Sequence, residues 1–183
     1  METKEKCQKK IDYVRNAFWF SLGAYALATQ SPTKDYLEQF RVNLSGDNIH
    51  VLKESEQAND HWLSYEVAFN HSLDDGSAKL FVNQTFQYMI LETFEAAKKY
   101  AEINALLKDF QNQDFYSFSR HLRNAIGHNG VWTINLNVKD LPATFRNKTI
   151  DLSLNGSSID GFVDWVYGLQ LCAAISVWVS NSN

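Results

Sequence analysis

The residues best suited to chemistry lie on one side of a helix that the sequence predicts over residues 115–130. At about 100° per residue, Phe115, Phe118, Leu122, Ala125 and Ile126 share one side, which predicts burial against neighbouring helices. The other side carries Tyr116, Ser117, Arg120, Arg123, Asn124 and Gly127, with His121 and His128 at its edge. No carboxylate occurs from Phe115 to Gly130. Because a surface kept only for solubility usually mixes both signs of charge, we interpret this side as an anion-binding surface.

The residue types on this side fit such a role, although each also has a structural reading. A guanidinium stays charged and binds phosphate oxygens through paired N–H groups. A histidine imidazole ordinarily has a pKa of about 6.5, so this group can act as acid or base near neutrality. From the residues alone, Arg123 and His128 could equally form a helix-end pair in which His128 favours the C-terminal dipole. A hydrogen-bonded structural role is the simpler reading of His121, which lies toward the buried edge.

The composition predicts a single folded domain over residues 1–183. Hydrophobic residues make up 45% and aromatic residues 14% of the chain, enough for a substantial core. The net charge of −4 disfavours non-specific coating of nucleic acid, so any such contact must be local. The N-terminus shows no signal-peptide pattern and no run of about 18 apolar residues occurs, so we expect a cytoplasmic protein. In that compartment Cys7 and Cys172 are expected to be free thiols.

Hydrophobic periodicity predicts mostly helices. Long helices are expected over residues 4–29, from Ser77 to about residue 100 with an extension to Phe110, and over about 159–180. Shorter helices are expected over residues 33–40 and from Trp62 toward Asp74. On the helix that begins at Ser77, Glu95 and Lys99 form a favourable pair four residues apart. The stretch 42–59 is the least readable, with 49–53 a short strand or one helical turn.

The period changes after the helix over 115–130. Apolar and polar residues alternate over 132–138 and again over 145–154, which predicts two short strands, with Asn147-Lys148 as a tight turn. Ser157 and Asp160 have the spacing of a capping box before the last helix. We therefore predict an all-α bundle of four to six helices with a small β-hairpin insertion, about 131–154, between the last two long helices.

The string Arg123-Asn124-Ala125-Ile126-Gly127-His128 resembles the signature of the HEPN superfamily. That signature is an Arg followed directly by a polar residue and, after four to six intervening residues, by a His. Here the gap is four residues and the polar residue is Asn124. The setting also resembles the family, because the motif ends a late helix in a helical chain and a hydrophobic helix closes the chain. The resemblance implies a HEPN-like bundle.

The resemblance also implies an activity. Most HEPN proteins are homodimers whose motifs face a shared cleft, and many are metal-independent ribonucleases that act as toxins or in phage defence. The catalytic residues would then be Arg123, Asn124 and His128, and the substrate-binding residues Arg120, His121, Asn129 and Tyr116. On a straight helix Arg123 and His128 lie about 140° apart, so they would flank a cleft without touching. A two-fold axis near Asn124 would bring an Arg and a His from different subunits to one phosphate.

The sequence leaves three functional hypotheses. The first is a homodimeric ribonuclease that acts on RNA without a cofactor and has an antitoxin or another protein partner. The second is a catalytically inactive HEPN module that binds RNA, a nucleotide or a protein, which the acidic net charge favours. The third is a purely structural helical dimer. A metal site is not expected, because the histidines and cysteines lack metal-ligand spacing.

Overall fold

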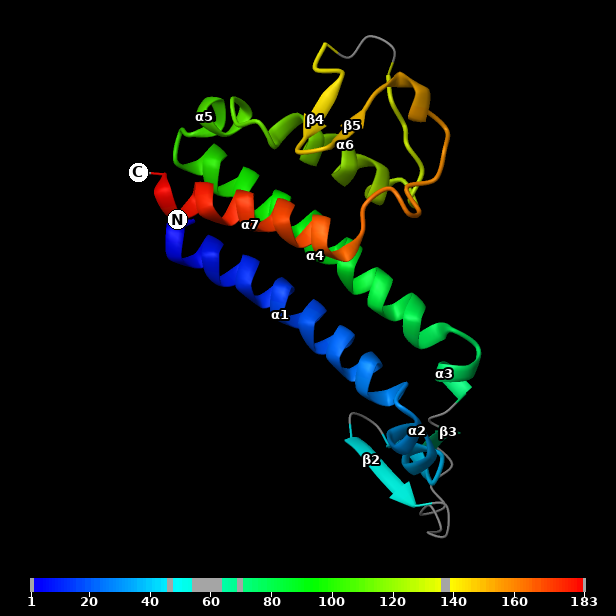
Figure 1. Ribbon diagram of the computed structural model, residues 1–183. Helices are drawn as coiled ribbons and strands as arrows, with labels where there is room; N and C mark the ends of the chain where they lie inside the picture. Colours follow the sequence, from blue (N-terminus) through cyan, green and yellow to red (C-terminus); the bar gives the residue numbers. More distant parts are fainter. Residues whose placement is uncertain (1, 46–47, 54–63, 69–70, 136–138, 183) are drawn as a thin grey trace. The chain divides into compact units, whose positions relative to one another are not determined.

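The computed structural model describes residues 2–45, 48–53, 64–68, 71–135 and 139–182 and is mostly helical, as predicted (Figure 1). Its contacts group the chain into two compact units, Met1–Phe18 with Thr85–Asn183, and Trp19–Gln84. The two longest helices, α1 (Lys4–Ala28) and α4 (Ser77–Ile103), contribute to both units. Both helices follow the predicted periodicity. Among the described residues no helix has both the length and the apolar character needed to cross a bilayer.

In the unit that contains both termini, α1 and α4 lie alongside α7 (Trp165–Asn181) (Figure 1). The α1 stripe Cys7, Ile11, Val14 and Phe18 is buried, at the three- and four-residue steps that one helix face requires. Polar contacts hold the helices at one end. The Gln8 amide donates to the backbone oxygen of Ser176 on α7 at 2.7 Å, and Lys10 pairs with Glu92 on α4 at 2.6 Å.

Helix α7 begins later than predicted, at Trp165 and not near residue 159. Gly161 has a φ of 73°, a left-handed conformation that an α-helix excludes. Asp164 is the true N-cap, since its carboxylate accepts a hydrogen bond from the Tyr167 backbone N–H at 2.8 Å. The capping box predicted from Ser157 and Asp160 is therefore wrong. Farther along, Gly168 lets α7 approach the Phe86 ring of α4 closely.

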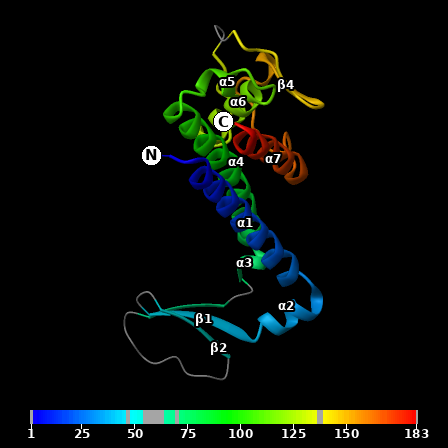
Figure 2. The ribbon, with the colours of Figure 1, turned by 90° about the vertical axis from the view of Figure 1, so that its left-hand side faces the viewer.

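Two shorter helices join α4 to the hairpin that follows, α5 (Leu107–Gln111) and α6 (Tyr116–Gly127). Figure 2 shows them beside each other near the end of α4. An aromatic cluster holds them, centred on the fully buried Phe110 ring. Its centroid lies 4.5 Å from that of Trp178, 5.2 Å from that of Tyr116 and 5.7 Å from that of Phe94. The cluster therefore ties α4, α5, α6 and α7 together around one set of rings.

A β-hairpin lies between α6 and α7, as predicted, but it is shorter than the predicted insertion. Its strands are β4 (Ala143–Phe145) and β5 (Lys148–Ile150), and a short 3₁₀ helix, η1 (Leu152–Leu154), follows. The pairing is antiparallel, with Thr144 opposite Thr149. The turn contains Arg146 at a φ of 51°. The Phe145 ring packs 6.0 Å from that of Phe118, so the hairpin covers α6.

The strand predicted over 132–138 is wrong where the structure describes it, and 136–138 lie outside the described residues. Val131 makes only an isolated bridge with Ser158. Trp132 exchanges backbone hydrogen bonds with that returning segment, donating to Ser157 at 2.9 Å and accepting from Gly156 at 2.8 Å. The Ile134 N–H instead donates to the Asn155 side chain. Trp132 and Ile134 are buried, so the alternation correctly marked their burial without a strand ladder.

The second unit contains an antiparallel sheet that the sequence did not predict. Its elements are α2 (Ser31–Leu37), β1 (Phe40–Ser45), β2 (Asn48–Lys53), β3 (Ser64–Ala68) and α3 (His71–Asp74), and the strand order is β2-β1-β3. The helix predicted from Trp62 toward Asp74 is wrong over residues 64–68, which pair with β1 and place Val67 opposite Val42, whereas 71–74 are helical. Residues 62, 63, 69 and 70 of that prediction lie outside the described residues. The strand option for 49–53 is confirmed. The helix predicted over 33–40 begins earlier, with Pro32 in its first turn, and Phe40 belongs to β1.

Candidate functional site

Helix α6 carries the motif and ends as predicted near its glycines. The buried side chains Phe118, Leu122 and Ala125 fix its inner face. His128 is the C-cap residue, and its N–H donates to the Asn124 carbonyl at 3.0 Å. Asn129 and Gly130 then adopt left-handed φ values of 57° and 74°, which terminate the helix. The Asn type at this position suits the turn, because Asn tolerates positive φ better than most residues.

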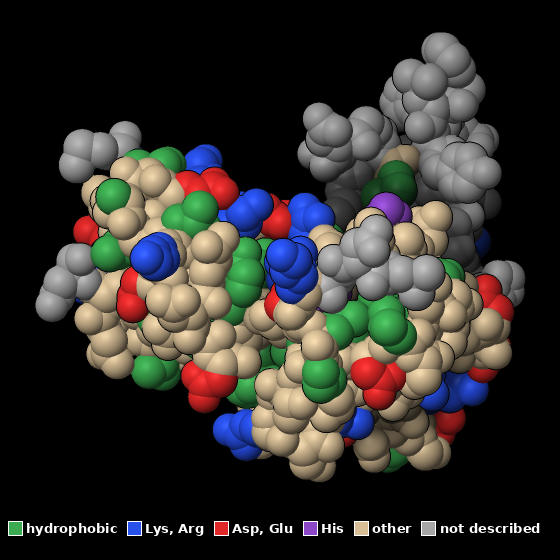
Figure 3. Space-filling view, turned by 90° about the horizontal axis from the view of Figure 1, so that it is seen from above, with side chains coloured by type: hydrophobic (Ala, Val, Ile, Leu, Met, Phe, Trp, Pro, Cys, Tyr) green, Lys and Arg blue, Asp and Glu red, His purple; other side chains and the backbone are tan. Residues whose placement is uncertain are grey.

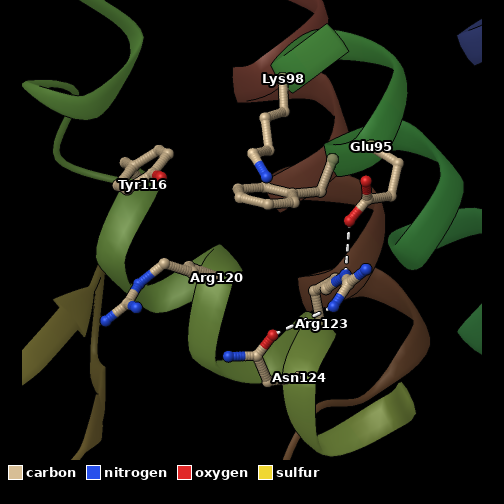
Figure 4. Close-up of a pocket in the computed structure, with 7 residues that line it drawn as sticks. Glu95, Lys98, Tyr116, Arg120, Arg123 and Asn124 are labelled. Carbon is tan, nitrogen blue, oxygen red and sulfur yellow. Dashed lines mark hydrogen bonds and ion pairs between the residues drawn. The ribbon is translucent and has the colours of Figure 1, made fainter. Parts of the chain in front are cut away.

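An open pocket of about 240 Å³ lies between α4 and α6 (Figure 4). Its lining residues are Phe94, Glu95 and Lys98 from α4, and Tyr116, Arg120, Arg123 and Asn124 from α6. The α6 residues belong to the predicted polar side, with Arg120 four positions after Tyr116, and Arg123 and Asn124 three and four positions after Arg120. The pocket therefore gathers three cationic side chains, one carboxylate and one amide at the motif helix.

Arg123 is held from two directions at this pocket. Its Nε lies 2.5 Å from Oε1 of Glu95, an ion pair whose alignment is not that of a hydrogen bond. Its Nη1 donates to the Asn124 side-chain oxygen at 3.2 Å. Figure 4 shows both contacts on one guanidinium. Among the described residues, contacts therefore engage two of the three guanidinium nitrogens. Nη2 is the nitrogen left for a ligand.

Arg120 makes a separate ion pair on the far side of α6. Its Nη2 lies 2.6 Å from both carboxylate oxygens of Asp140. His121 joins this pair, with Nε2 at 3.3 Å from Asp140 Oδ1 and 3.2 Å from Arg120 Nη2. The Arg120 guanidinium points away from that of Arg123 (Figure 4). Arg120 thus lines the pocket with its stem while its charge is directed to Asp140.

The pKa values in this cluster follow from burial and charge. Burial lowers the pKa of His121 below its ordinary value, and the adjacent Arg120 charge lowers it further, so the neutral imidazole is favoured. For Asp140, burial acts to raise the pKa, but the hydrogen bonds and charge of Arg120 outweigh it and hold the pKa below its ordinary value. The cluster is therefore a neutral histidine beside a guanidinium–carboxylate pair.

The predicted site residues separate into three places. Arg120, Arg123, Asn124 and Tyr116 line the pocket, although Tyr116 is only 9% exposed and packs in the aromatic cluster. His121 is buried against Asp140, which matches its structural reading. His128 and Asn129 are exposed beyond the end of α6 and do not line the pocket.

Sequence reasoning missed Glu95, Lys98 and Asp140. Glu95 contacts Arg123 on another helix, although its spacing had suggested a pair with Lys99. Asp140 lies just after the first predicted strand, where no site residue was expected. Although α6 itself carries no carboxylate, both of its arginines meet one from elsewhere in the chain. Basic and acidic side chains are likewise interspersed on the face drawn in Figure 3.

The described residues contain no group of histidine, cysteine or acidic side chains arranged to hold a metal ion. Comparison of the chain with protein-family models, with curated proteins and with solved structures finds no match. The residues at the end of α6 and the pocket beside them are therefore the features that bear on function.

Proposed function

We propose that this protein is a homodimeric, metal-independent endoribonuclease of the HEPN type. The observation that supports the proposal is that one helix end presents the three motif residues together with a polar pocket. Arg123 and Asn124 line that pocket, and His128 is exposed at the cap of the same helix. A toxin or phage-defence role, with an antitoxin as partner, remains a prediction from the family resemblance.

In the proposed reaction an imidazole accepts the proton of the ribose 2′-hydroxyl. The 2′-oxygen attacks the adjacent phosphorus, and the bond to the 5′-oxygen breaks as that oxygen receives the proton from the same, now protonated, imidazole. The products are a 2′,3′-cyclic phosphate and a 5′-hydroxyl. Arg123 stabilises the charge on the phosphorane oxygens, and Asn124 orients its guanidinium. His128 supplies this imidazole, from the copy opposite the one that supplies Arg123.

The proposal needs two copies because His128 does not line the pocket that contains Arg123. The two residues lie about 140° apart around the helix, so a single copy does not direct both at one phosphate. A two-fold axis near Asn124 would place His128 of one copy beside Arg123 of the other. Each dimer would then contain two composite sites.

A second candidate is an inactive HEPN module that binds RNA, a nucleotide or a protein. One observation favours it: Glu95 and Asp140 already neutralise the two arginines of the motif helix. In an active enzyme the phosphate must compete with Glu95 for Arg123. In a module without catalysis the ion pair would simply help to hold α4 against α6.

The test is RNA cleavage in EDTA by the wild-type protein and by the Arg123→Ala and His128→Ala variants. We expect each substitution to reduce the rate at least about 100-fold, since each removes a transition-state or proton-transfer contact. The matched controls are Arg15→Ala and His50→Ala. Arg15 also pairs with a carboxylate, Asp12, and its side chain is 40% exposed against 38% for Arg123. Equal background cleavage in all five proteins would exclude the enzyme and favour the inactive module.

Mixing the two inactive variants tests the composite site. In a mixed dimer one site has an intact Arg123 from one copy and an intact His128 from the other, and the second site has neither. Because about half of randomly exchanged dimers are mixed, we expect about a quarter of the wild-type activity to return. No recovery after verified subunit exchange, or a monomer at micromolar concentration in sedimentation, would rule out the composite site.

A further inference from the structure

The three cations that line the pocket differ in how firmly the protein neutralises them. Arg120 lies 2.6 Å from both oxygens of Asp140, and Arg123 lies 2.5 Å from Glu95. The Lys98 ammonium lies 3.6 Å from its nearest carboxylate, Glu102, beyond the distance of a normal hydrogen bond. Within the described part of the chain, Lys98 is therefore the pocket cation with the longest ion pair to a carboxylate.

Lys98 is also available to a ligand. Its side chain is 39% exposed, and its ion pair with Glu102 lies along the surface of α4, where such pairs contribute little. In Figure 4 the Lys98 amine extends toward the space between α4 and α6. A phosphate that enters this space can take up the three ammonium donors without breaking a short ion pair.

We infer that Lys98 forms a phosphate-binding subsite for single-stranded RNA in this pocket, beside the phosphate that Arg123 contacts. The inference rests on the proposed function, and it adds a residue of α4 to a site that the motif places on α6. Because Arg123 is assigned to the cleaved phosphate, Lys98, one helical turn beyond Glu95 on the neighbouring helix, contacts a flanking phosphate.

The pocket favours the backbone of RNA over its bases. Phe94 and Tyr116 are the aromatic residues of the lining, but they are only 2% and 9% exposed and pack against each other and Phe110. They offer no open ring face on which a base could stack. The accessible groups are cations, an amide and the Glu95 carboxylate, and the cations and the amide bind phosphate oxygens without regard to sequence. The subsite therefore contributes affinity and not base selectivity.

The test measures binding of a short, fluorescently labelled single-stranded RNA in the His128→Ala background, where cleavage does not interfere. Lys98→Ala is compared with Lys99→Ala, an exposed lysine at the next position of α4 that does not line the pocket. We expect Lys98→Ala to weaken binding about tenfold and to reduce the slope of log K against log salt by about 1. Lys99→Ala should change neither quantity, and Lys98→Arg should retain most of the affinity.

Equal affinities and slopes for the Lys98→Ala and Lys99→Ala variants would overturn the inference, as would the absence of saturable RNA binding by the parent. Thermal unfolding of each variant checks that the fold is intact. The cleavage test is independent of this one. If RNA binding depends on Lys98 but no EDTA-resistant cleavage depends on Arg123 and His128, the subsite stands and the enzyme does not.

Discussion

Replacement of Gly168 by alanine tests the closeness of α7 and α4. A Cβ at this position would overlap both Cε2 and Cζ of the Phe86 ring and would lie 3.1 Å from Cδ1 of Ile90. Such an overlap is closer than any normal carbon contact. Phe86 is itself buried, so its ring cannot swing into solvent to make room. The substitution must therefore move the ring or separate the two helices.

The expected magnitude combines two opposing effects. Overfilling a packed core typically costs about 1–3 kcal/mol. Replacing glycine by alanine inside a helix contributes about 1 kcal/mol of stability. We therefore expect Gly168→Ala to lower the free energy of unfolding by up to about 2 kcal/mol, which for a chain of this length lowers the Tm by up to about 8 °C.

The assay is chemical denaturation, with the midpoint as the readout. Gly127→Ala is the matched control, because Gly127 is also helical, belongs to the same unit and has nothing within 4 Å of the position that an added Cβ would take. We expect this control to be neutral or more stable than wild type by up to about 1 kcal/mol. If Gly168→Ala raises the midpoint as much as Gly127→Ala does, the close approach of α7 to α4 is incorrect.

Other expectations concern titration, thiol reactivity and one buried hydrogen bond. Because burial and the adjacent guanidinium lower the pKa of His121, the unfolded chain protonates first and stability should fall as the pH drops below about 6.5. Denaturation above and below that pH should show a smaller loss of stability for His121→Gln than for the wild type, and an equal loss in both would contradict this account. Burial raises the pKa of Cys7 and of Cys172 to about 12, so both thiols should react with a disulfide reagent only on unfolding. Rapid labelling of either thiol in the folded protein would contradict this burial. Trp178→Phe removes the 2.8 Å hydrogen bond to Asp109 and should cost about 1–3 kcal/mol in denaturation, a value near zero showing that water replaces the indole.

Local patterns predicted most of the helical framework. The stripe from Cys7 to Phe18 and the glycines after α6 specify a helix face and a helix end without reference to distant residues. Strand β3 was mistaken for a helix because its structure depends on pairing with β1, a contact that apolar spacing does not report. The start of α7 was misplaced because the apolar pattern continues past Gly161 and does not report the left-handed conformation of that residue.

The candidate site, like the fold, could be predicted from the sequence only in part. Helical spacing alone places Arg120, Arg123 and Asn124 at one pocket, and it also separates His128 from them. The charge balance could not be read from α6, because Glu95 and Asp140 come from other elements and reach the arginines only after packing. A face that is purely basic in sequence is therefore largely neutralised in the folded chain, and Lys98 becomes the cation of interest.

The bridge between Val131 and Ser158 joins the two ends of the segment that connects the motif helix to the last helix. The Gly130 carbonyl also accepts a hydrogen bond from the Ile159 N–H at 2.8 Å, so the segment leaves and returns at one point. When a loop that is closed at its base becomes longer, the entropic cost of closing it rises little, since each doubling of the loop length costs only about 0.6 kcal/mol. The exposed turn of the hairpin is therefore a suitable place for an affinity tag or a fused reporter, which would leave the ends of α6 and α7 in position.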